Sequence, residues 1–161
     1  MSQDVVAELA PNGTLRAGIN LSNPLLVTGS TPTGDPAGVS PDLARAIADR
    51  LRVKILYVPF ASPGEVADAA GSDAWDIGLI AAEPARAETM AFTPAYVEIE
   101  ATYMVPEDSP LQSIEDVDKP GVRIAVSARA AYDLYLTRTL KHAELHRAKG
   151  LGGAVDLFVN E

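Results

Sequence analysis

The 161-residue sequence contains no cysteine, which excludes disulfides, thiolate nucleophiles and cysteine-rich zinc sites. It also has no surplus of basic residues: 13 Lys and Arg against 22 Asp and Glu give a formal net charge of −9 at pH 7. An anionic protein is repelled by nucleic acid and by anionic membrane surfaces, so neither is an expected partner. A chain without cysteine fits either redox compartment and does not indicate a location.

Long apolar runs are missing too. No segment approaches the roughly 20 apolar residues that a membrane-spanning helix needs. The first residues, MSQDVVAELAPNG, lack the basic and apolar regions of a secretory signal, so a cytoplasmic protein and a mature or engineered start both stay open. With 47% hydrophobic and 22% charged residues, the chain is expected to fold and not to be disordered.

The first hundred residues alternate between strand and helix patterns. Two of the helices begin with Ser-Pro, and we expect Ser40 and Ser62 to be their N-caps. The expected elements are a strand at 14–20, a helix from Ser40, a strand at 53–59, a helix from Ser62 to about Gly71, and a strand at 75–82. This β-α-β-α-β order predicts an α/β fold with a parallel sheet covered by helices.

The same pattern restarts after an extended, β-prone segment at 98–106. A short helix at 113–117 comes first, and the expected elements after it are a strand at 122–127, a helix at 130–140, a strand at 144–148 and a helix at 153–161. We therefore predict two lobes, 1–102 and 103–161, with a hinge near 98–106. The second lobe is short for an independent core.

Ligands of parallel α/β sheets bind outside the carboxyl ends of the strands. Asn20, Phe60 and the segment Ala81-Ala82-Glu83 stand at those ends. Arg86 follows at once, after a Pro-broken turn. A guanidinium at this edge is suited to bind a carboxylate, because its planar fork matches two oxygens.

Three segments, GVSPDLARAIADRL, WDIGLIAAEPARAETMAFTPAYVEIEATYMVPEDSPLQSIEDV and GVRIAVSARAAYDLYLTRTL, resemble the amino-acid-type extracellular solute-binding proteins of ABC transporters. The resemblance runs from about Thr14 to Glu161. It implies a type II periplasmic-binding-protein-like fold, in which two α/β lobes close on a small polar ligand. It also implies a periplasmic or extracellular location and an ABC permease as partner.

The resemblance further implies roles for single residues. Arg86 matches the arginine that pairs with the ligand α-carboxylate, and Phe60 matches an aromatic that lies against the ligand. The chain departs from the family where hydroxyl groups are usual, with Ala82 and Glu83 before Arg86 and with Arg129-Ala130 after the strand that ends at Ser127. The full predicted set is Asn20, Asn23, Phe60, Ala82, Glu83, Arg86, Ser127, Arg129 and Ala130.

Each of these residues also has an ordinary structural interpretation. Arg86 could be a surface arginine paired with Glu83 or Glu88, which would stabilise the fold little. Glu83 either neutralises Arg86 or binds a ligand amine; Phe60 could belong to the core, and Arg129 could simply be exposed. His142 and His146 are four residues apart, but no third ligand can be named, so we predict neither a metal nor a cofactor.

Proteins of the family are longer than this chain, which stops before the second lobe would be complete. We expect apolar faces to stay uncovered there, and a homodimer through this lobe is one way to cover them. The leading interpretation is a solute-binding protein and not an enzyme. Two alternatives stay open: a sensor or scaffold domain of the same fold, and a cyclohexadienyl dehydratase-like enzyme with Glu83 as the candidate acid.

Overall fold

The computed structural model describes residues 3–161. By its internal contacts the chain forms two compact units. The first unit runs to Ala81 and includes Glu88–Met90, and the second consists of Ala82–Ala87 and Ala91–Glu161. This division lies earlier in the chain than the predicted boundary at 102/103, and the hinge near 98–106 stays a prediction.

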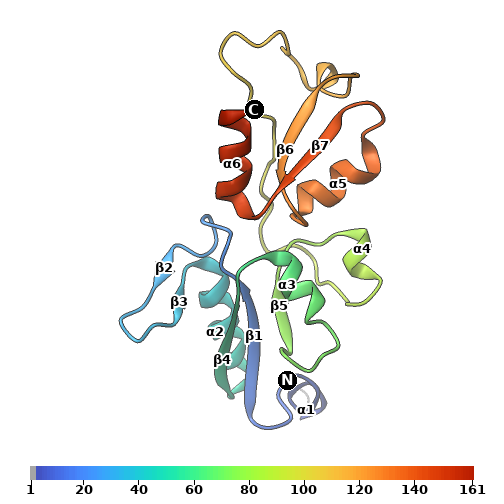
Figure 1. Ribbon diagram of the computed structural model, residues 1–161. Helices are drawn as coiled ribbons and strands as arrows, with labels where there is room; N and C mark the ends of the chain where they lie inside the picture. The colour runs from blue at the N-terminus through green and yellow to red at the C-terminus, as the bar shows by residue number, and fades with distance from the viewer. Residues whose placement is uncertain (1–2) are drawn as a thin grey trace. The chain divides into compact units, whose positions relative to one another are not determined.

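The first unit is built on a parallel sheet with the strand order β4-β1-β5 (Figure 1). The pairing of β1 with β4 runs in register from Thr14↔Lys54 to Asn20↔Phe60. The elements of this unit are α1 (Gln3–Leu9), β1 (Thr14–Asn20), the short hairpin β2 (Gly29–Ser30) and β3 (Pro36–Ala37), α2 (Val39–Leu51), β4 (Lys54–Phe60), α3 (Pro63–Asp68) and β5 (Ile77–Leu79). The predicted strand at 14–20 is confirmed at both ends.

The core of this unit forms around β1, where Leu15, Ala17 and Ile19 are fully buried. β1 is the central strand of the sheet and is covered by helices. Most of its side chains are therefore apolar. Gly18 leaves room for the indole of Trp75: a Cβ there would lie 3.1 Å from the ring. The indole N–H of Trp75 donates to the Val66 carbonyl at 3.0 Å.

Two predictions about element ends in this unit are wrong. The strand expected at 75–82 is only β5, Ile77–Leu79, because the chain leaves the sheet before the turn that begins at Glu83-Pro84. Ser40 is not the N-cap of α2, since Gly38 holds that position with φ 132°. The Ser40 N–H donates instead to the Leu26 carbonyl at 3.1 Å, so a neighbouring loop fixes the helix start.

The prediction for α3 is confirmed at its beginning. The Ser62 hydroxyl accepts the Glu65 N–H at 3.2 Å, and Pro63 occupies the first helical position. The helix ends at Asp68, a little before the predicted Gly71.

The second unit contains the parallel pair β6-β7, with α5 and α6 on opposite sides of it (Figure 1). Its elements are α4 (Pro84–Ala87), a 3-10 turn η1 (Ile114–Asp116), β6 (Arg123–Ser127), α5 (Ala131–Thr139), β7 (Glu144–Ala148) and α6 (Gly150–Asn160). The predicted strand at 144–148 is confirmed, whereas α6 begins three residues before the predicted start. The β-prone segment at 98–106 forms no strand.

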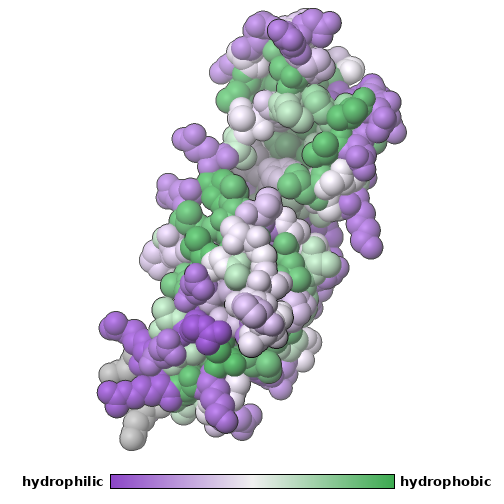
Figure 2. Space-filling model, turned by 90° about the vertical axis from the view of Figure 1, so that its left-hand side faces the viewer, coloured by the Kyte–Doolittle hydropathy of each residue, from purple (hydrophilic) through white to green (hydrophobic). Residues whose placement is uncertain are grey.

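The core of the second unit is small and consists of the buried residues Val117, Ile124, Val126 and Leu136 with partly buried neighbours. On α6, in contrast, Leu151, Val155 and Val159 are 47%, 43% and 70% exposed. Figure 2 views the molecule from the side of α6 and shows hydrophobic surface in its upper part. Apolar side chains are therefore uncovered here, as expected; the homodimer that could cover them stays a prediction.

Candidate functional site

The single turn α4 carries two buried charges, which is unusual for so short a helix. Glu83 directly precedes it and is 8% exposed, and Arg86 within it is 4% exposed. The turn forms locally because the Glu83 carbonyl accepts the N–H groups of Arg86 and Ala87 at 3.0 Å each. Pro84 suits the first helical position, where its missing N–H costs nothing. Both charged side chains therefore leave the same turn toward the interior of the second unit.

Glu83 is bound by Arg138 of α5. The two terminal nitrogens of the Arg138 guanidinium, Nη1 and Nη2, donate to Oε2 at 2.5 Å and to Oε1 at 3.2 Å. Such a bidentate pair is stronger and more directional than a single contact. The hydrogen-bonded partner of Glu83 therefore lies 55 residues away in the sequence. The two roles expected for Glu83, neutralising Arg86 or binding a ligand amine, stay predictions.

Arg86 donates from Nη2 to the backbone carbonyl of Arg129 at 3.0 Å. Burial lowers its pKa from the ordinary value, because a desolvated guanidinium is less stable as a cation; Glu83 opposes this shift and the nearby Arg129 adds to it. The interpretation of Arg86 as a surface arginine is therefore wrong. Its role as a carboxylate clamp stays a prediction.

Asp133, in the first turn of α5, organises the loop that holds Arg129. Its carboxylate is 3% exposed and accepts the backbone N–H of Arg129 at 2.7 Å and Nε of Arg147 at 2.9 Å. Arg129 is in the left-handed region, with φ 64°, which costs energy for any residue other than glycine. The hydrogen bond from its N–H to Asp133 supports that conformation.

Sequence reasoning missed Asp133, Arg138 and Arg147. An acidic residue in the first turn of a helix is a readable signal for Asp133, since it favours the positive end of the helix dipole. The arginines had no local signal: Arg138 meets Glu83 and Arg147 meets Asp133 only in the folded unit.

The other predicted residues of this unit lie around the same loop. Ser127 ends β6 half-buried, and its carbonyl accepts the Ala130 N–H at 3.2 Å. Ala130 is the buried N-cap of α5, and its methyl side chain cannot accept a capping hydrogen bond. Ala82 is exposed. The second unit thus brings Glu83, Arg86, Arg129 and Ala130 together, beside Ser127.

The remaining predicted residues belong to the first unit. Asn20 and Phe60 end β1 and β4 opposite one another in register, so they are neighbours at the carboxyl edge of the sheet. The Asn20 carboxamide oxygen accepts from the N–H and the hydroxyl of Ser22 at 3.1 and 2.7 Å. The Asn23 oxygen accepts the Leu25 N–H at 3.0 Å. Both carboxamide oxygens therefore take part in local turns.

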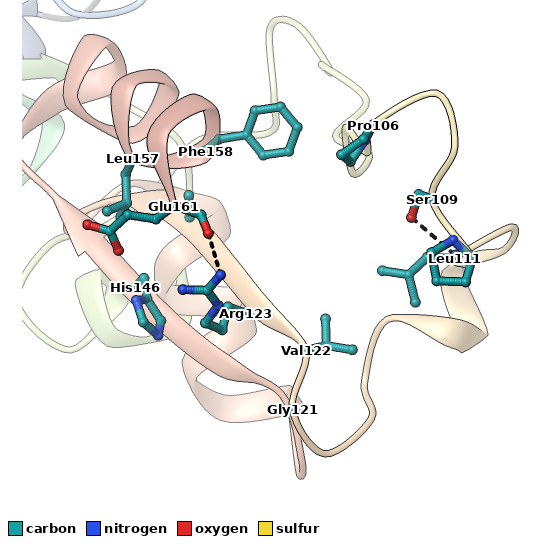
Figure 3. Close-up of a pocket in the computed structure, with 12 residues that line it drawn as sticks. Pro106, Ser109, Leu111, Gly121, Val122, Arg123, His146, Leu157, Phe158 and Glu161 are labelled. Carbon is teal, nitrogen blue, oxygen red and sulfur yellow. Dashed lines mark hydrogen bonds between the residues drawn. The ribbon is translucent and has the colours of Figure 1, made fainter.

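A separate groove of about 360 Å³ lies in the second unit, and none of the predicted residues lines it (Figure 3). Its walls come from α6, from β6 and β7, and from the loop near Pro106 and Leu111. Apolar groups dominate, with Arg123, His146 and Glu161 as charged or titratable members. Arg123 donates to the Glu161 carbonyl within it.

Comparison with known families decides what this architecture belongs to. The model of the bacterial extracellular solute-binding proteins, family 3, matches residues 15–151. The chain belongs to that family. As a family 3 solute-binding protein it has the predicted type II periplasmic-binding-protein-like fold. No curated protein sequence matches it.

Solved structures of similar fold include an ancestral amino acid-binding protein described as a precursor of cyclohexadienyl dehydratase. It is 26% identical, with a TM-score of 0.75, and the match covers 96% of this chain and 69% of that one. A putative ABC-transporter binding component from Wolinella succinogenes, complexed with lysine, is 21% identical, with a TM-score of 0.71 and coverages of 92% and 65%. A cysteine-binding protein from Campylobacter jejuni is 21% identical, with a TM-score of 0.68 and coverages of 98% and 63%.

This family 3 protein therefore spans about two thirds of the length of these structures, with the second lobe incomplete. Within residues 3–161, no helix is long and apolar enough to cross a membrane. In the same part of the chain, no group of three or more His, Asp or Glu side chains is placed to hold a metal ion.

Proposed function

We propose that this family 3 protein reversibly captures a small ligand that carries a carboxylate, an amino acid or a related acid, and that Arg86 binds the carboxylate. The observation that carries the proposal is the burial of the Arg86 guanidinium, which is 4% exposed. Burying a charged side chain costs free energy because its hydration is lost, unless interactions within the site compensate for that loss. A planar guanidinium fork recognises a carboxylate through two parallel hydrogen bonds.

The ligand class is supported by what similar structures bind. The Wolinella succinogenes protein was solved with lysine and a truncated protein from T. maritima with arginine, and the Campylobacter jejuni protein is a cysteine-binding protein. All three ligands share the α-carboxylate and differ in the side chain. An amino-acid-like ligand for this chain, delivered to an ABC-type permease outside the cytoplasm, follows the same pattern.

Binding without chemistry is favoured over the dehydratase alternative by the hydrogen bonds of Glu83. A general acid must hold a proton that it can give to its substrate. Both oxygens of Glu83 instead accept hydrogen bonds from the Arg138 guanidinium, so neither is left to donate a proton to a substrate in this arrangement. The resemblance to a precursor of cyclohexadienyl dehydratase makes an assay for that activity a useful control.

The test is a thermal-shift screen of the 161-residue protein against the common amino acids and small carboxylic acids, followed by calorimetry. A ligand that binds only the native state stabilises it by about 2.7 kcal/mol at a hundredfold excess over Kd. We expect Arg86→Gln to abolish the shift, and Arg50→Gln, which changes an exposed arginine of α2, to preserve it. Equal binding by Arg86→Gln and the unchanged protein would exclude the clamp.

A further inference from the structure

We infer that the groove in the second unit accepts one further β-strand, which continues from α6, lies against β6 and runs parallel to it. The groove is walled by β6 and α6 on one side and by the loop from Pro106 to Leu111 on the other (Figure 3). The apolar ring of Phe158 lines it from α6. It is separate from the charge cluster around Glu83 and Asp133, and the inference does not depend on the proposed function.

The edge of β6 that faces away from β7 presents backbone groups without a strand partner. Val122 and Ala128, which flank β6, both hydrogen-bond to β7 at 2.9 Å. Because successive residues of a strand alternate, the N–H groups of Arg123, Ala125 and Ser127 face the other edge. In the part of the chain that the structure describes, no strand pairs with this edge. An unpaired edge of this kind is a template for a further strand.

The two helices of the unit indicate on which side the next strand belongs. They cover opposite faces of the strand pair: Arg147 of β7 contacts Asp133 of α5, whereas its neighbour Ala148 lies 3.2 Å from where a Cβ on Gly153 of α6 would be. About 98% of connections between parallel strands are right-handed. Since the connection through α5 leads from β6 to β7, a right-handed connection through α6, on the opposite face, leads back to the free edge of β6.

The helix α6 also ends where such a strand would begin. Arg123, the first residue of β6, donates to the carbonyl of Glu161, which directly follows the helix. A strand that starts there and follows the groove runs in the same direction as β6. The comparison structures are long enough to include such a strand, since this chain covers 69%, 65% and 63% of them.

The same strand would account for the segment at 98–106, which is β-prone in sequence and forms no strand here. This segment leads to Pro106 on the far wall of the groove. Its side chains Ile99, Met104 and Val105 are 47%, 64% and 37% exposed. A strand in the groove would lie between β6 and the end of this segment, and would offer each of them a pairing edge.

The experiment extends the chain at Glu161 by a Gly-Asn-Gly connection and a strand of about six alternating Val and Thr residues. A matched control of the same length has Pro in place of Val, because Pro lacks the N–H that a strand donates to its neighbour. Hydrogen exchange measured by mass spectrometry compares residues 123–127 in both extended proteins with the 161-residue protein. Residues 14–20 of the first unit serve as the internal reference.

We expect the Val-Thr extension to slow exchange at 123–127 on the order of tenfold or more, because its hydrogen bonds to β6 must open before these amides exchange. The Pro control should leave their exchange unchanged, and residues 14–20 should exchange alike in all three proteins. Equal exchange at 123–127 in the two extended proteins would overturn the inference.

A second copy of the chain is the other occupant that the measurements would reveal. The 161-residue protein would then be a dimer by light scattering, and residues 123–127 would be more protected at higher protein concentration. That result would also overturn the inference. None of these measurements involves a ligand, so their failure leaves the carboxylate clamp at Arg86 untouched.

Discussion

Replacing Asp133 should destabilise the second unit more than any other single change in the charge cluster. In Asp133→Ala, the backbone N–H of Arg129 loses its buried acceptor, and Arg147 loses its partner. A hydrogen bond to a charged group contributes about 1.5–3 kcal/mol. The Arg147 side chain is 44% exposed, so its share is the smaller one, about 1 kcal/mol or less. We expect a total loss of about 2–4 kcal/mol.

Asp133→Asn should cost less, about 1–2 kcal/mol, because the carboxamide oxygen can still accept the Arg129 N–H and only the charge is lost. The order Ala worse than Asn therefore tests the hydrogen bond to the backbone separately from the ion pair with Arg147. Asp156→Ala is the matched control: it removes the same charge from an exposed position on α6 and should change stability little.

The assay is urea unfolding followed by two probes. The chain has a single tryptophan, Trp75, which packs in the core of the first unit, whereas far-ultraviolet circular dichroism reports on both units. We expect Asp133→Ala to shift the circular-dichroism transition to lower urea. The tryptophan transition should move less, since its surroundings lack Asp133. The reasoning fails if Asp133→Ala and Asp156→Ala unfold at the same urea concentration.

Two further predictions concern other parts of the fold. The Asp118 carboxylate accepts the N–H groups of residues 141–143 at 2.8–3.1 Å, and these bonds, that of Ala143 first, lower its pKa from the ordinary 3.8. Its contribution to stability is therefore present above about pH 4 and lost as pH falls through the lowered pKa. Thermal unfolding measured from pH 2 to 7 should show this loss of stability in the parent protein. If Asp118→Asn loses as much stability in acid as the parent does, the prediction is contradicted. Gly38→Ala should cost at least about 1–3 kcal/mol in chemical unfolding, because φ is 132° and a Cβ would lie 2.6 Å from the Leu26 carbonyl; a variant as stable as the parent would refute the clash.

Local sequence signals predicted the elements whose hydrogen bonds and packing are themselves local or strongly patterned. The strand at 14–20 follows from a short β-prone run that comes directly after the Pro11-Asn12-Gly13 turn. The start of α3 follows from Ser62-Pro63, because the capping bond joins residues three apart. The family resemblance rests on the same kind of information, since it follows residue order.

Where a loop or a distant side chain sets the outcome, the sequence could not decide it. Ser40 has the same neighbours in sequence as a true N-cap, yet its N–H is bonded to Leu26 and the cap moves to Gly38. Arg86 was predicted as a cation at the edge of a sheet, but its burial could not be read from its neighbours.

The charge cluster shows the difference most clearly. The sequence by itself determined that acidic and basic residues stand near the ends of strands, where a ligand site was expected. Only the tertiary structure decided which charges meet: Glu83 with Arg138, and Asp133 with Arg147. Partners separated by 55 and 14 residues are chosen by how β6, α5 and the turn at α4 pack, because a charge interacts with whatever the folded chain brings within a few ångströms of it.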